Sequence, residues 1–182
     1  MLIRCNMEMI KVIKEEIIYD SGRSTADRAA ALLLEKPELL KDFENIAFGN
    51  IYPYDMRASN VIEKADKLSH GFAKCLIPKI ISHLPLFKND GPRRQFLLML
   101  IRYIKELSDE QIGILYELCL KYATNQKMPV AVRNNSIRIL NEICIMFPEL
   151  KPDVFFNLKM RIHEEKEPFK KLLTKYINNK SN

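Results

Sequence analysis

The most constraining feature of the sequence is a proline that recurs at a nearly constant interval. The interval is 39, 37 and 39 residues between Pro53, Pro92, Pro129 and Pro168. Each of these prolines precedes a stretch in which apolar residues have helical spacing. The tripeptide Pro-Glu-Leu keeps a similar period, because it occurs at positions 37–39 and again 111 residues later. Self-similarity on this scale is typical of stacked repeats, so we expect the chain to be built from repeated units.

The repeated unit is predicted to be helical. Residues 133–147 carry Ile137, Leu140, Cys144 and Phe147 at steps of three and four, which places them on one face of a helix. The chain has only five glycines and almost no sustained alternation of apolar and polar residues, so strands are not expected. The fold class is therefore predicted to be all-α.

Capping residues and helix breakers divide the chain into about ten helices. Ser108 with Gln111 predicts a capping box, Ser24 with Asp27 predicts another, and Pro78 places one helix start near Ile77. The other expected helices span residues 8–19, 37–48, 54–68, 92–107, 129–147, 152–163 and 168–178. Paired in sequence, they predict about five antiparallel hairpins in a single domain covering residues 1–182.

Composition bears on the cellular location of the protein and on whether it binds a metal or another cofactor. No apolar run approaches a membrane span, and the first residues carry no export signal. The four cysteines, Cys5, Cys75, Cys119 and Cys144, stand singly beside apolar residues, which favours buried thiols in a reducing cytoplasm. The three histidines are not in zinc-ligand spacing with one another or with any cysteine, so neither a metal nor another cofactor is expected.

Three phrases open the expected second helices of the hairpins in a similar way. They are Asp55–Ala58 before Val61, Asp90–Arg94 before Leu98 and Ile101, and Pro129–Arg133 before Ile137 and Leu140. These phrases resemble HEAT-like repeats of the armadillo-type superhelix, and the likeness extends over roughly residues 24 to 178. The resemblance implies a right-handed α-α superhelix, a solenoid of about five HEAT-like helix pairs, with a role in protein binding or scaffolding.

The resemblance also gives two readings of the repeat arginines Arg57, Arg94 and Arg133. In the favoured reading they bond across repeats to loop acids such as Asp55 or Asp90. In the alternative reading they form a ladder of anion contacts.

A partner protein or peptide is expected to bind on the concave wall that the second helices form. The candidate contacts are the residues on the polar side of the second helices, with positions counted from the repeat arginine of each helix. They are Ser59, Glu63, Asp66, Gln95, Arg102, Asn134, Arg138 and Asn141.

Nucleic-acid binding is the main alternative function. The net charge is +6, and Tyr52, Tyr54 and Tyr103 are residue types that stack on bases. However, the candidate wall mixes Glu63 and Asp66 with Arg102, whereas a phosphate backbone needs several uncompensated cations. An enzyme is not expected, because the sequence has no GxSxG elbow, no glycine-rich phosphate loop and no HExxH.

Overall fold

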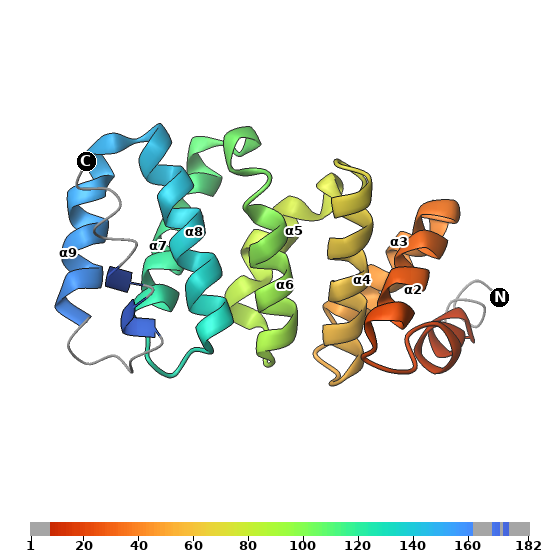
Figure 1. Ribbon diagram of the computed structural model, residues 1–182. Helices are drawn as coiled ribbons and strands as arrows, with labels where there is room; N and C mark the ends of the chain where they lie inside the picture. Colours follow the sequence, from red (N-terminus) through yellow and green to blue (C-terminus); the bar gives the residue numbers. More distant parts are fainter. Residues whose placement is uncertain (1–7, 162–168, 172, 175–182) are drawn as a thin grey trace. The chain divides into compact units, whose positions relative to one another are not determined.

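The computed structural model describes residues 8–161, 169–171 and 173–174 (Figure 1). All regular structure in this part of the chain is helical, with no strand. The chain divides into two compact units between Leu100 and Ile101. Whether the two units form one domain, as the sequence predicts, stays a prediction, and each unit is described here by itself.

Unit 1 contains hairpins whose second helices pack side by side. A first helix over residues 8–17, which ends in a π-helical turn at Ile13–Ile17, precedes α2 (Arg23–Glu35). A 3-10 turn at Pro37–Leu39 leads into α3 (Leu40–Ala47), which packs against α4 (Tyr54–Leu68). The next hairpin consists of a 3-10 turn at Lys74–Leu76, α5 (Ile77–His83), a 3-10 turn at Leu84–Leu86 and α6 (Asp90–Leu100).

Helix α4 is the centre of unit 1, because it packs against α2 on one side and α6 on the other. Its apolar residues Ala58, Val61, Ile62 and Ala65 are almost completely buried. The hairpins are joined further by aromatic packing, since the ring of Phe48 stacks on that of Phe96 with centroids 5.2 Å apart. The core therefore runs between successive hairpins, as it does in repeat proteins.

Unit 2 follows the same plan. After a 3-10 turn at Ile104–Glu106, α7 (Asp109–Thr124) packs against α8 (Val130–Met146) and also against α9 (Lys151–Arg161). A 3-10 turn at Pro148–Leu150 opens α9. Residues 169–171 and 173–174 are helical, and Phe169 and Leu173 are buried.

The repeated prolines and the Pro-Glu-Leu tripeptides have equivalent positions in the structure. Pro53 and Pro129 are the N-caps of α4 and α8, and Pro92 lies in the first turn of α6. Both Pro-Glu-Leu tripeptides form the 3-10 turn that opens a first helix. Proline is suited to these positions because its φ is preset for a helical turn and it offers no N–H. Pro168 lies outside the described residues.

Several local predictions are confirmed and three are corrected. The span 54–68, the start at Ile77 and the Ser108 capping box are observed. Ser24 does not cap α2, which begins at Arg23 without a side-chain cap. The helix expected over 92–107 ends at Leu100 and resumes only as the 3-10 turn. The third correction concerns the thiols, because Cys75 is exposed whereas Cys119 and Cys144 are buried. Cys5 and the end of the helix expected over 168–178 lie outside the described residues.

Candidate partner-binding groove

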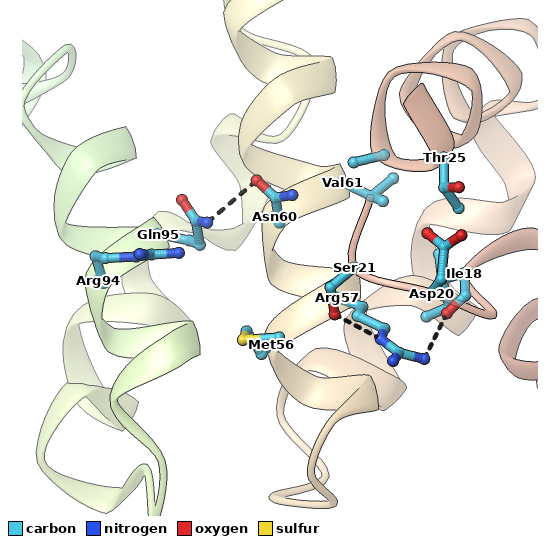
Figure 2. A pocket seen from close by; sticks show the side chains of 11 residues that line it. Ile18, Asp20, Ser21, Thr25, Met56, Arg57, Asn60, Val61, Arg94 and Gln95 are labelled. Atoms are coloured by element: carbon cyan, nitrogen blue, oxygen red, sulfur yellow. Dashed lines mark hydrogen bonds between the residues drawn. The ribbon is translucent and has the colours of Figure 1, made fainter. Parts of the chain in front are cut away.

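A groove of about 220 Å³ crosses the N-terminal halves of α2, α4 and α6 in unit 1. Figure 2 shows α4 in the middle, α6 on one side and the loop before α2 on the other. Its lining residues come from these three helices and from the loop at 18–21. They are Ile18, Asp20, Ser21, Thr25, Ala26, Met56, Arg57, Asn60, Val61, Arg94 and Gln95.

Arg57 ties α4 to the loop on the far side of the groove. Its Nε donates to the Ser21 hydroxyl at 3.2 Å, and its Nη1 donates to the carbonyl oxygens of Ile18 and Tyr19 at 3.2 and 2.6 Å. The expected acceptor Asp55 instead accepts a hydrogen bond from the Asn89 side chain. Arg57 therefore bonds across repeats as predicted, but to two carbonyl groups and a hydroxyl. The two carbonyl groups follow the end of the preceding helix, where they lack intrahelical donors.

On α6, the structural counterpart of this arginine is Arg93 rather than Arg94. Arg93 is buried, forms an ion pair with Asp90, and donates to the carbonyl oxygens of Leu84 and Phe87 at 3.2 and 2.5 Å. Its neighbour Arg94 is exposed and lines the groove. The assignment of Arg94 as the repeat arginine is corrected by one residue, since adjacent residues on a helix point about 100° apart.

In unit 2, Arg133 points inward, and the acceptor of its Nε lies within its own hairpin rather than in a neighbouring repeat. It is buried, and its Nε donates to the Ala123 carbonyl at the end of α7 at 3.1 Å. Its guanidinium lies 3.7 Å from the centre of the Phe169 ring. The acceptor is again a carbonyl rather than the loop acid that the resemblance implied. The anion-ladder reading is therefore wrong for Arg133, which is buried.

The negative charge in the groove belongs to Asp20. Its carboxylate accepts the backbone N–H of Gly22 at 2.7 Å. This bond, a hydrogen bond from Thr25 and the nearby Arg57 and Arg28 hold the pKa of Asp20 below its ordinary value. Asp20 is thus ionised at neutral pH, and its oxygens already have donors.

Helices α4 and α6 are held together at the groove by an amide pair and a close backbone approach. Gln95 Nε2 donates to Asn60 Oδ1 at 3.1 Å, across 35 residues of sequence. One turn earlier, Gly91 lies so close to α4 that a Cβ added there would be 2.5 Å from Met56 Cγ. The glycine is required at this position because any larger residue would push the two helices apart.

Four of the eight predicted binding residues belong to unit 1, and of these Gln95 lines the groove, although only 7% of its surface is exposed. Ser59, Glu63 and Asp66 are buried, with 0%, 4% and 0% of their surface exposed. The Ser59 hydroxyl donates to the Met56 carbonyl at 2.9 Å, and Asp66 accepts the Ala73 N–H at 3.1 Å. These side chains therefore present little surface to a partner.

The other four predicted residues belong to unit 2. Arg138 is exposed, whereas Arg102, Asn134 and Asn141 are half-buried. Their role in binding stays a prediction.

Sequence reasoning did not select Asn60 or Met56. The spacing of Asn60 from Gln95, 35 residues, is close to the proline interval and is the signal that connects them.

Two general features of the described part of the chain also bear on function. No group of three His, Cys, Asp or Glu side chains is placed to hold a metal ion among these residues. None of the described helices combines the length and apolar character that crossing a membrane requires.

Comparison with known protein families gives one result, a match of residues 13–179 to a HEAT repeat domain. The chain belongs to the HEAT repeat family. This confirms the predicted family and the all-α, helix-pair fold class. No curated protein and no solved structure matches the sequence. HEAT repeat domains generally mediate protein interaction or scaffolding, and they are typically not enzymes. In this HEAT repeat protein, the groove described above lies on the second helices of three successive hairpins.

Proposed function

We propose that this protein is a non-enzymatic interaction module that binds a segment of a partner protein in the groove across α2, α4 and α6. The observation that carries the proposal is a groove whose polar side chains are already held in place. Arg57 is fixed by three acceptors, and Asn60 is fixed by Gln95. A surface organised in this way loses little conformational entropy when a partner docks, which favours binding.

The size of the groove favours an extended segment over a folded domain. At about 30 Å³ for each water in the liquid, its volume corresponds to about seven waters. This is room for one or two side chains of a peptide. Gln95 is the residue of the predicted binding set that takes part. The predicted contact at Arg138 in unit 2 remains a proposal, as does a scaffold role that uses both units.

The cytoplasm remains the proposed location. Cys119 and Cys144 are buried free thiols, and burial raises the pKa of the Cys119 thiol well above its ordinary range. Such thiols are typical of proteins kept under reducing conditions.

Affinity purification with a blocked groove tests the proposed function. Asn60→Phe places a large ring in the groove, whereas Asn45→Phe makes the same change at an exposed position of α3. Both tagged variants are checked for folding by circular dichroism, and the captured proteins are quantified by mass spectrometry. We expect one or a few proteins to be captured by the wild type and by Asn45→Phe, and to be lost with Asn60→Phe.

Two results contradict the proposal. Equal capture by Asn60→Phe shows that the partner binds elsewhere. Stoichiometric nucleic acid in the wild-type eluate, with protein capture abolished by nuclease, supports the nucleic-acid alternative instead.

A further inference from the structure

Two neighbouring loops of unit 1 expose large apolar side chains. One loop, residues 48–53, leads into α4, and the other, residues 84–89, includes a 3-10 turn and leads into α6. Ile51 and Tyr52 on the first loop have 54% and 67% of their surface exposed, and Leu86 on the second has 59%. With the exposed Pro85 they form what we call the loop patch, which consists of Ile51, Tyr52, Pro85 and Leu86. Apolar surface of this kind marks sites that bind a membrane or another protein.

The two loops are held next to each other by direct contacts. The backbone N–H of Lys88 donates to Asn50 Oδ1 at 2.9 Å. The ring centroids of Phe48 and Phe87 lie 5.5 Å apart, and Phe87 packs in turn on the buried Phe96. The loops are therefore anchored to the core, while the side chains of the loop patch stay exposed.

The only charge within the two loops is positive. Their twelve residues contain one charged side chain, Lys88, which is exposed and makes no ion pair with a described residue. The acids that follow the loops already have partners. Asp55 is buried and accepts a hydrogen bond from the Asn89 amide, and Asp90 forms an ion pair with Arg93. A negatively charged surface is therefore attracted to the loop patch.

A second ammonium group lies at the start of α4. Lys14 of the first helix places its Nζ 5.3 Å from the centre of the Tyr54 ring. Tyr54 follows the first loop directly.

An anionic membrane surface fits these features better than a protein does. Apolar side chains enter the boundary between lipid headgroups and acyl chains, where tyrosine is especially favoured. Ammonium groups beside them attract anionic headgroups. A protein interface, in contrast, carries about one hydrogen bond for each 100–200 Å². Within the loop patch, the Tyr52 hydroxyl is the only side-chain group that can form one.

We propose that the loop patch binds the surface of an anionic membrane, with its apolar side chains in the lipid boundary and the Lys88 ammonium on an anionic headgroup. This is contact with the surface of a bilayer and not a span across it. The loop patch shares no residue with the groove across α2, α4 and α6, so this inference goes beyond the proposed function.

Sedimentation with vesicles tests the apolar contribution. The full chain is titrated with vesicles of equal parts phosphatidylcholine and phosphatidylserine. Leu86→Ser is compared with Leu68→Ser, which is the matched control because Leu68 is 68% exposed at the other end of α4. We expect Leu86→Ser to weaken binding about fivefold or more, because it removes the burial of about half a leucine side chain. Leu68→Ser is expected to bind like the wild type, and circular dichroism checks the folding of both variants.

A charge reversal tests the electrostatic contribution. Lys88→Glu is compared with Lys67→Glu, since Lys67 is also exposed and lies in the last turn of α4. We expect Lys88→Glu to weaken binding to these vesicles about tenfold and Lys67→Glu to have little effect. Vesicles of phosphatidylcholine alone are expected to bind the wild type more weakly.

Three results overturn the inference. They are no sedimentation of the wild type with the anionic vesicles, equal binding by the two Leu→Ser variants, and equal binding by the two Lys→Glu variants. Loss of a captured protein partner with Leu86→Ser, in the absence of vesicle binding, assigns the loop patch to a protein interface instead. Asn60→Phe, which blocks the groove, is expected to keep wild-type vesicle binding, so this inference and the proposed function fail independently.

Discussion

Replacing Gly91 with alanine is expected to destabilise unit 1, although alanine is the better helix former. Gly91 is the second residue of α6 and faces Met56 of α4. A Cβ at this position would lie 2.5 Å from Met56 Cγ, 2.6 Å from Met56 Cβ and 3.4 Å from Met56 Cα. A side-chain rotation can move Cγ, but Cβ is attached to the α4 backbone, so the two helices have to separate.

The magnitude follows from two opposing effects. Overpacking a tight contact costs about 1–3 kcal/mol. The higher helix propensity of alanine compared with glycine offsets at most about 1 kcal/mol of this cost. The net destabilisation is therefore expected to lie between about 0 and 3 kcal/mol, centred on about 1–2 kcal/mol.

Gly113→Ala is the matched control in unit 2. No atom lies within 4 Å of a Cβ added at Gly113, which is exposed within α7. Here propensity alone acts, and we expect stabilisation by about 0.5–1 kcal/mol. The same substitution is thus expected to lower the stability at position 91 and to raise it at position 113.

The assay has to resolve the two units, because a chain with two compact units need not unfold in a single step. Urea denaturation followed by circular dichroism gives the overall change. Hydrogen exchange with mass spectrometry then assigns it, and we expect faster exchange of α4 and α6 peptides in Gly91→Ala. In a Met56→Ala background, which removes Cγ but keeps Cβ, the cost of Gly91→Ala should be smaller but not zero. A Gly91→Ala protein as stable as the wild type, with unchanged exchange in α4 and α6, would refute the close-approach reasoning.

Two further predictions concern buried charges. The Glu44 carboxylate is buried, which by itself raises its pKa, but hydrogen bonds from the ammonium groups of two lysines on α3 and α5 outweigh this effect and hold the pKa below its ordinary value of 4.5. The ionised form therefore stabilises the fold above the unfolded-state pKa, and this contribution is lost as the pH falls through the folded-state pKa. The stability gap between the wild type and Glu44→Gln, measured as the urea midpoint, should shrink between about pH 5 and about pH 3; a gap that stays constant over this range would contradict the prediction. Arg133→Met is expected to destabilise unit 2 by about 1–3 kcal/mol because it leaves a buried carbonyl without its donor, whereas Arg138→Met at an exposed site should change stability by no more than about 0.5 kcal/mol; equal effects in thermal melts would show that the buried bond contributes little.

Part of the candidate site was predictable from the sequence. Gln95 was selected as a polar position on a second helix, and it lines the groove together with Arg57 and Arg94, which were selected as repeat arginines. Ser59 and Asp66 were selected by the same counting, but both are buried. Helical periodicity gives the direction in which a side chain points from the axis of its helix. It does not say how closely the next helix covers that direction.

The sequence by itself determined the repeating plan, because the features that encode it act within a few residues. Proline presets the first turn of a helix, so the Pro-Glu-Leu tripeptides form 3-10 turns in both units. The Ser108 capping box is equally local, since its two hydrogen bonds join residues three positions apart. Such elements depend mainly on residues a few positions apart.

Only the tertiary structure decided which side chains face inward and which form the groove. Arg93 and Arg94 are adjacent and identical in chemistry, yet one is buried on loop carbonyls and the other is exposed. That difference arises from how α6 packs on α4, where Gly91 admits the close approach of Met56. Packing depends on residues that are more than 30 positions apart in the chain, as the Asn60–Gln95 pair is, and no local pattern encodes it.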